Sequence, residues 1–117
     1  MGNTATINYG NGCLYTGSVT HGKRNGEGVY KCKNRSNYSG EWVNNDRHGQ
    51  GVMTRKFKRG DVLWEESYEG MFQRDQKNGF GSLIMRSKNS VCHYKGLMVD
   101  GLPAKKIDLV CFNKGKP

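Results

Sequence analysis

The chain has 117 residues, enough for one domain, and carries a net charge of +9 that favours acidic partners such as nucleic acid, anionic lipid or tubulin-like proteins without choosing among them. Glycine occurs 17 times and proline twice, so the glycines demand a structural reason other than a collagen repeat. There is no apolar run of about 20 residues and no secretory profile at the N-terminus, so we expect a cytoplasmic protein.

The first residues fit a lipidation pattern. Residues 1–6 read Met-Gly-Asn-Thr-Ala-Thr, which matches M-G-x-x-x-[ST] and would place a myristoyl chain on Gly2. The pattern is short and frequent by chance. Residues 6–9 are expected to form one strand ahead of the first repeat unit.

A repeat of one tyrosine and three glycines then runs through the chain. Counted from the tyrosine, the glycines stand at offsets 2, 11 and 13 in three units, and a fourth unit keeps only the first two positions. The matching residues are Tyr15, Gly17, Gly26 and Gly28; Tyr38, Gly40, Gly49 and Gly51; Tyr68, Gly70, Gly79 and Gly81; and Tyr94 and Gly96. In the fourth unit Lys105 and Ile107 stand in place of the later glycines.

Further columns predict that each unit is a β-hairpin. Apolar side chains recur at offset 4 (Val19, Trp42, Phe72, Met98) and offset 15 (Tyr30, Met53, Leu83). Because successive side chains alternate, offsets 0, 2 and 4 share one face of a first strand, and offsets 11, 13 and 15 share one face of a second. Offset 7 holds Gly22, Asn45, Asp75 and Gly101, which all tolerate the positive φ of a tight turn. Each strand glycine would leave room for an aromatic ring above the backbone, giving a thin core.

The connections between units differ in length. Residues 54–67 are expected to form a projecting hairpin, residues 87–90 a shorter one, and residues 107–112 a closing strand. A basic tail follows, with Lys105, Lys106, Lys114 and Lys116. The whole chain, residues 1–117, is thus predicted to be one all-β domain: an elongated, single-layer, twisted antiparallel sheet of nine or ten strands, about 40 to 45 Å long.

The motif Tyr38-Ser39-Gly40-Glu41-Trp42 followed by Gly49-Gln50-Gly51 resembles the MORN (membrane occupation and recognition nexus) repeat. The resemblance covers roughly residues 12–101. It implies a rod of consecutive hairpins that acts as an adaptor, as in ciliary and cytoskeletal assemblies, lipid-kinase regulatory regions and junctional proteins. The extra residues before Tyr68 and the missing glycines after Tyr94 depart from that pattern.

Two sets of residues are candidates for contact with an acidic protein or a phosphate. The first is a basic column at offset 9, on the hairpin turns, formed by Arg24, Arg47 and Lys77. The second is the basic and aromatic cluster on the insertion, formed by Arg55, Lys56, Phe57, Lys58, Arg59 and Trp64. The alternative is that the column consists of solvated turn residues. The repeat aromatics are expected to form the core, although a partner segment could lie along them.

No catalytic, cofactor or metal site is expected. The sequence lacks a P-loop, a nucleophile elbow and paired histidines at chelating spacing. Cys13, Cys32, Cys92 and Cys111 form no C-x-x-C pair and are expected to be reduced thiols that bind no zinc with His21, His48 or His93.

The sequence therefore predicts a non-catalytic scaffold that docks into a larger assembly, most plausibly a microtubule-based ciliary or other cytoskeletal one, through acidic partners such as tubulin or axonemal proteins. The alternative is peripheral binding to anionic phospholipid through Gly2 and the 55–59 cluster. Charge-driven nucleic-acid binding ranks below both, because the aromatics are used in the repeat and no recognition module is visible.

Overall fold

The computed structural model describes residues 3–33 and 35–114, and these residues form a nearly all-β molecule. The strands are β1 Asn3–Asn8, β2 Cys13–Thr20, β3 Lys23–Cys32, β4 Ser36–Val43, β5 Asp46–Arg59, β6 Val62–Gln73, β7 Gln76–Arg86, β8 Ser90–Val99, β9 Leu102–Pro103 and β10 Val110–Asn113. A single 3₁₀ turn, η1, spans Lys106–Asp108.

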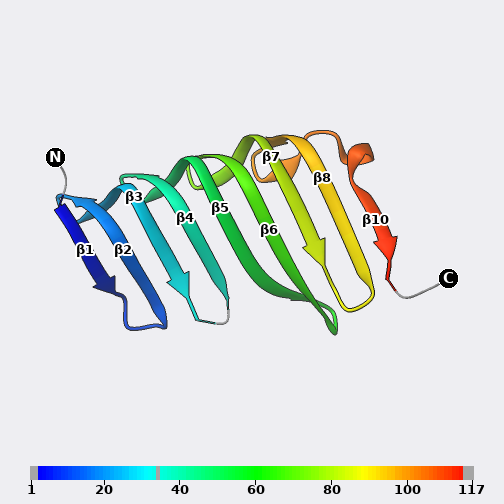
Figure 1. Cartoon of the computed structure of the whole chain (residues 1–117), viewed down its shortest axis with the longest axis horizontal. Coiled ribbons are helices and arrows are strands. Elements are labelled where there is room, and N and C mark those ends of the chain that lie inside the picture. The colour runs from blue at the N-terminus through cyan, green and yellow to red at the C-terminus, as the bar shows by residue number, and fades with distance from the viewer. Residues whose placement is uncertain (1–2, 34, 115–117) are drawn as a thin grey trace.

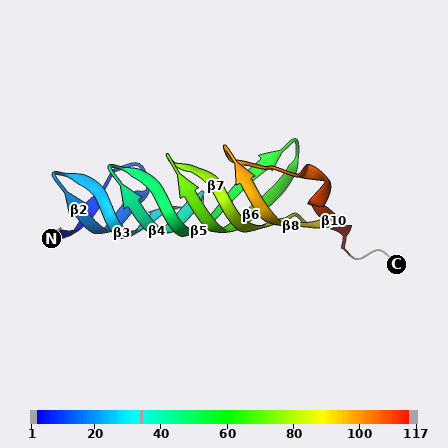
Figure 2. The same ribbon diagram turned by 90° about the horizontal axis from the view of Figure 1, so that it is seen from above.

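All strands belong to one open antiparallel sheet. The order is β1-β2-β3-β4-β5-β6-β7-β8-β10, and the short β9 pairs with the other end of β8 (Figure 1). Seen from above, the sheet is a single curled layer (Figure 2). Its extents are 54 × 29 × 19 Å, longer than we expected because the strands run obliquely to the long axis. The predicted fold class is confirmed.

The hairpin turns lie at the positions predicted from the sequence. The offset-7 residues Gly22, Asn45, Asp75 and Gly101 all have positive φ, between 68° and 87°. The residue before each of them also has positive φ, which is the conformation of the two-residue turn that matches strand twist.

The strand glycines make room for the tyrosine rings. Gly51 and Gly40 face each other across β5 and β4, and a Cβ built at Gly51 would overlap the Tyr38 ring. The same overlap would occur between Gly28 and Tyr15 and between Gly81 and Tyr68. The rings therefore lie flat on bare backbone and are buried on one side of a sheet that has no second layer. We call this side the tyrosine face and the opposite side the outer face.

Each tyrosine also caps an irregularity that the sequence did not reveal. The strand pairing shifts by two residues between Gly17 and Val19, between Gly40 and Trp42, and between Gly70 and Phe72. The tyrosine hydroxyl donates to the carbonyl of the residue inside each shift, for example Tyr38 Oη to Glu41 O at 2.9 Å. The equivalent bonds reach Ser18, Met71 and, in the fourth unit, Leu97. A tyrosine hydroxyl thus bonds the backbone carbonyl three residues further along the chain in every unit, and in the first three units that carbonyl belongs to the bulge residue.

The two terminal strands lie away from their predicted positions. The first spans residues 3–8, because its pairing with β2 begins at Asn3 opposite Val19. The last begins at Val110: residues 106–108 form η1, and Ile107, which is 91% exposed, has no core to enter. Strand periodicity alone could not distinguish this turn from a strand.

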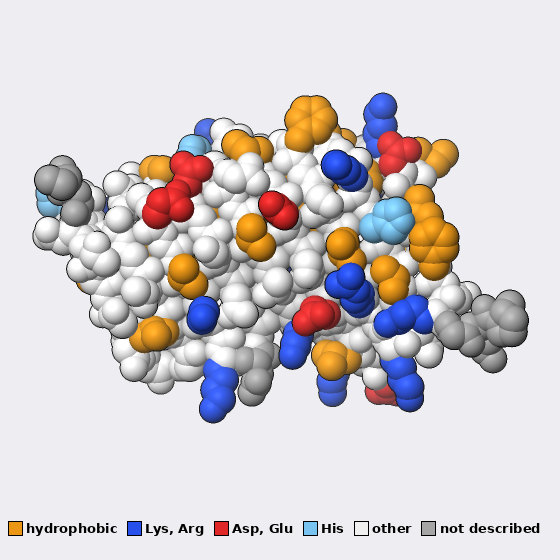
Figure 3. Space-filling view, viewed as in Figure 1, with side chains coloured by type: hydrophobic (Ala, Val, Ile, Leu, Met, Phe, Trp, Pro, Cys, Tyr) orange, Lys and Arg blue, Asp and Glu red, His pale blue; other side chains and the backbone are white. Residues whose placement is uncertain are grey.

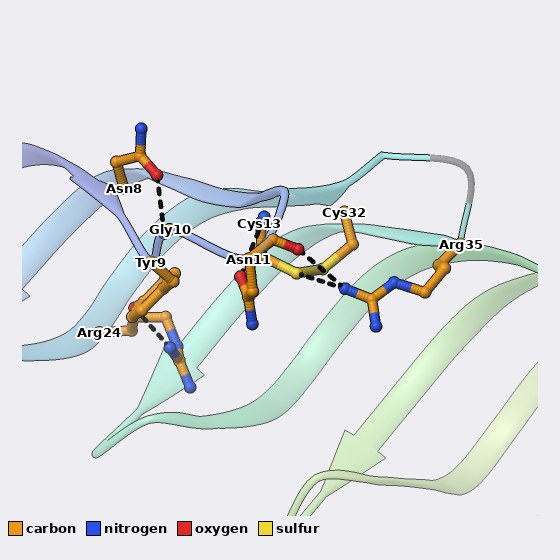
Figure 4. Close-up of a disulfide and its surroundings, with 8 residues drawn as sticks. All are labelled: Asn8, Tyr9, Gly10, Asn11, Cys13, Arg24, Cys32 and Arg35. Carbon is orange, nitrogen blue, oxygen red and sulfur yellow. Dashed lines mark hydrogen bonds between the residues drawn. A yellow bond between two sulfur atoms is a disulfide. The ribbon is translucent and has the colours of Figure 1, made fainter.

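The expectation of reduced cysteines is wrong. Register places Cys13 opposite Cys32 on β2 and β3, and Cys92 opposite Cys111 on β8 and β10, and both pairs are disulfides. A guanidinium nitrogen of Arg35 lies 3.3 Å from Cys13 Sγ and donates to the carbonyl of Asn11 (Figure 4). The pairs were missed because both are 19 residues apart in sequence, with no short Cys motif to mark them.

Candidate interaction surfaces

The tyrosine face is a continuous ladder of rings. Trp42 meets Tyr15 and Tyr38 edge to face, with ring centroids 5.6 and 5.0 Å apart. Phe72 meets Tyr38 and Tyr68 in the same way, at 5.0 and 5.2 Å. These are favourable aromatic geometries. Tyr15, Tyr68 and Phe72 are at most 2% exposed, so the ladder is the core, as the sequence predicted.

Arg24, the first member of the basic column, lies across this ladder. Its guanidinium carbon is 5.2 Å from the Tyr30 ring centroid and 4.8 Å from that of Trp42, within cation–π range. Its terminal nitrogens donate to Tyr9 Oη and to the Asn45 carbonyl. Its Nε is buried and has no hydrogen-bond partner among the described residues. The guanidinium of Arg24 therefore has neutral oxygens and rings around it and no acidic partner among the described residues.

Arg47 repeats the arrangement one unit later. Its guanidinium carbon is 5.0 Å from the Phe72 centroid, and its Nε pairs with Asp75 Oδ1 at 2.8 Å. The Arg47 side chain is 26% exposed and that of Asp75 52%, so solvent screens this ion pair.

Lys77, the third member of the column, turns inward instead of outward. Its side chain is only 13% exposed, and its Nζ lies 2.9 Å from Glu66 Oε2. Arg55 Nε pairs with the other oxygen of Glu66 at 2.6 Å. Burial acts to raise the pKa of Glu66, but the hydrogen bonds and charges of Lys77 and Arg55 outweigh it and hold that pKa below its ordinary value. The buried Glu66 carboxylate therefore stays ionised between the two cations.

Three arginines converge on one hollow of the tyrosine face, which we call the arginine groove. It has a volume of about 300 Å³. It is lined by Arg24, Tyr30, Ser36, Asn37, Tyr38, Trp42, Arg47, Met53, Arg55 and Asp75. Guanidinium groups above an aromatic floor suit a carboxylate carried on an apolar segment.

The tyrosine hydroxyls below the arginines stay neutral in the ordinary pH range. Burial raises the pKa of Tyr38 to about 12, although Arg47 acts in the opposite direction. Burial likewise raises the pKa values of Tyr15 and Tyr68. The positive charge of the groove is thus not cancelled by phenolate.

The insertion forms the predicted projecting hairpin from β5 and β6. Its two strands pair from Arg55 opposite Glu66 out to Arg59 opposite Val62, beyond the neighbouring strands. Arg55 folds back over the Phe57 ring at 4.6 Å. Lys56, Lys58 and Arg59 are exposed, and Phe57 and Trp64 are half-buried. Leu63, near the tip, is 54% exposed.

This hairpin belongs to a longer positive surface, which we call the basic edge. It follows the long edge that carries the β3–β4, β5–β6 and β7–β8 connections, the lower edge in Figure 3. Its exposed cations are Lys31, Lys33, Arg35, Lys56, Lys58, Arg59, Arg86, Lys88 and Lys114. The exposed acids there are Asp61 and Glu65. A depression of about 340 Å³ beside the hairpin is lined by four of these cations together with Leu63 and Trp64.

The structure therefore separates the two predicted sets of contact residues. The column of Arg24, Arg47 and Lys77 lies on the tyrosine face, where its charges pack on rings and carboxylates. The hairpin cluster lies on the basic edge, apart from Arg55, which also lines the groove. Their roles in partner binding stay predictions. Gly2 and Lys116 lie outside the described residues.

The sequence reasoning missed the convergence of Arg55 with Arg24 and Arg47. The pairing of Tyr38 with Met53 and of Ser36 with Arg55 was available from the repeat offsets, and it brings these residues onto adjacent strands. Within the described residues, no group of three or more His, Cys, Asp or Glu side chains could hold a metal ion. Across the same residues, no helix is long and apolar enough to cross a membrane.

Comparison with known proteins agrees with the repeat boundaries. The family model for the MORN repeat matches residues 15–36, 38–56 and 68–90. The chain is also similar to MORN repeat-containing protein 3 of Xenopus laevis, with 31% identity over 80 residues. That alignment covers 67% of this chain and 33% of the Xenopus protein, so the chain spans about a third of the length of the relative it matches.

Proposed function

This chain belongs to the MORN repeat family, and we propose that it is a non-catalytic scaffold that holds an acidic protein segment in its arginine groove. The family suggests a protein-interaction or membrane-binding role, and the groove supports the first of these. The single observation that carries the proposal is the cavity in which Arg24, Arg47 and Arg55 surround a floor of Tyr38 and Trp42.

The charges in the groove are not fully balanced from within. Arg47 pairs with Asp75 and Arg55 with Glu66, whereas Arg24 contacts only neutral oxygens and rings among the described residues. A partner carboxylate in the groove would gain the attraction of the Arg24 guanidinium, which has no acidic partner among the described residues, and its neighbouring side chains would lie on Tyr30 and Met53.

The proposed assembly is a microtubule-based ciliary or other cytoskeletal one, because members of the family occur in such assemblies and because a net charge of +9 favours acidic partners. The test is co-sedimentation of the full chain with microtubules, either intact or stripped of their acidic tails by limited proteolysis. We expect binding to need the tails and to weaken about tenfold in Arg24→Gln. Lys23→Gln, one residue away on an exposed side chain, is the matched control. Equal sedimentation of both variants and of stripped microtubules contradicts the proposal.

The basic edge favours a second candidate function, peripheral binding to anionic phospholipid. Its cations lie in a row beside the exposed Val62 and Leu63, an arrangement that suits charged headgroups above an apolar layer. Vesicle flotation with and without phosphatidylserine tests it. Lys56→Glu/Lys58→Glu should abolish flotation at moderate salt, whereas Lys23→Glu on the opposite edge should not. Equal flotation with and without phosphatidylserine would rule this function out.

A further inference from the structure

The last strand of the sheet is held by little besides its disulfide. β10 has four residues, and all four are exposed, so no buried side chain anchors it. It pairs with the outer edge of β8 through Val110 opposite His93 to Asn113 opposite Ser90. The remaining contacts are a stack of Phe112 on His93, with centroids 5.8 Å apart, a hydrogen bond from Lys114 N to Asn89 O and a long one, 3.4 Å, from Ser90 Oγ to Asn113 Oδ1. Short exposed strands of this kind open readily.

The other disulfide has a different setting. Cys13 and Cys32 are 3% and 8% exposed, and they join β2 and β3 beside the buried Tyr15. Those two strands pair from Cys13 opposite Cys32 as far as Thr20 opposite Lys23, and a tight turn connects them directly. We therefore expect their hairpin to hold without the sulfur bridge. Cys111, by contrast, lies on an exposed strand and closes a loop that contains β9 and η1.

From this asymmetry we propose that Cys92–Cys111 is a redox latch: its reduction releases β10 and opens the outer edge of β8, residues 90–93, to an added strand. A thiolate of a dithiol reductant attacks Cys111 Sγ and forms a mixed disulfide, and Cys92 leaves as a thiolate. The second thiol of the reductant then displaces Cys111, so the protein gains two electrons and two protons and the reductant becomes a disulfide. Edge-strand addition is a general docking mode, and the segment that fits has the character of β10: short, uncharged, with an aromatic side chain over His93.

The closed loop makes the predicted effect measurable. Removing a cross-link across 19 residues should raise the population of released β10 roughly a hundredfold. Hydrogen exchange of the full chain, oxidised and after dithiothreitol, should lose protection at residues 90–93 and 110–113 and keep it in β2 and β3. Cys111→Ser should show the same loss without reductant, and Cys13→Ser/Cys32→Ser should not. Unchanged protection at residues 90–93 after complete reduction overturns the latch.

A second arm tests the open edge as an acceptor. A fluorescent peptide of residues 108–114 with serine at 111 is titrated into the Val110→Pro/Cys111→Ser variant, whose own β10 cannot pair fully. We expect a saturable rise in anisotropy that oxidised wild-type protein does not give. No rise at millimolar peptide overturns strand acceptance at this edge. Neither arm depends on the arginine groove, so these results and those of the proposed function are independent.

Discussion

Replacing Gly51 by alanine tests how the rings and the glycines hold this sheet together. Gly51 has ordinary strand φ, so alanine adds no backbone strain there. Its Cβ would overlap the Oη, Cε1 and Cζ atoms of Tyr38, which must move. Overpacking of this kind costs about 1–3 kcal/mol, and loss of the Tyr38 hydroxyl bond to the Glu41 carbonyl adds about 1 kcal/mol. We expect the free energy of unfolding to fall by about 3 kcal/mol.

Urea unfolding followed by tryptophan fluorescence measures the effect, because Trp42 packs on Tyr38 with centroids 5.0 Å apart. The control is Gly22→Ala, where φ is +76° and a Cβ would meet nothing within 4 Å, so only backbone strain of about 1 kcal/mol is added. In a Tyr38→Ala background Gly51→Ala should cost little, giving a coupling of about 3 kcal/mol. Equal costs for the two glycine variants, or no coupling, would refute the reasoning.

Three further results are expected. Glu66→Gln should lower stability by about 3 kcal/mol at neutral pH, because it leaves Lys77 buried without its counter-charge. Since the folded pKa of Glu66 is lowered, its contribution is present above its ordinary value of 4.5 and is lost as pH falls through the folded value, so denaturation curves of Glu66→Gln should lose that acid dependence. The raised pKa of Tyr38 has the opposite effect on the pH dependence: its contribution to the free energy of unfolding is present below the ordinary value of 10.0 and is lost as pH rises toward about 12. An ultraviolet titration of the phenolate, with circular dichroism recorded in parallel, would measure this loss. Arg47→Gln should change thermal stability by less than about 1 kcal/mol, because its pair with Asp75 is solvent-screened, and a larger loss would show that the groove arginines are structural.

Much of the fold was predictable because the spacing of tyrosines and glycines in the repeat determines which residues of adjacent strands pair. Once Tyr15 and Gly17 are placed opposite Tyr30 and Gly28, every unit follows, including the turn at Gly22. The ring-on-glycine packing follows from the same pairing. The sequence could not show that a tyrosine hydroxyl bonds the carbonyl at each bulge, because no residue type marks that position.

The Cys13–Cys32 disulfide could have been predicted by the same argument. Cys13 stands two residues before Tyr15 and Cys32 two after Tyr30, so the predicted hairpin already places them opposite each other. Cys92 and Cys111 could not be paired in this way, since the fourth unit has lost its second strand and the chain returns through η1.

The basic residues were the least predictable part of the site. Counting offsets put Arg24 and Lys77 on hairpin turns, yet long cationic side chains fold back over rings and carboxylates when these lie within reach. The positive charge was evident from the sequence, but the direction in which each cationic side chain points depends on its neighbours in the folded structure.

A nuclear magnetic resonance titration of the full chain with a glutamate-rich peptide tests the central claim most directly. Trp42, on the floor of the groove, donates its indole Nε1–H to the Gly28 carbonyl, and the Arg24 guanidinium carbon lies 4.8 Å from its ring centroid. If the arginine groove is the docking site, the indole and guanidinium signals of these two residues shift together and saturate. Shifts confined to Lys56, Lys58 and Arg59, or no shift at all, would contradict it.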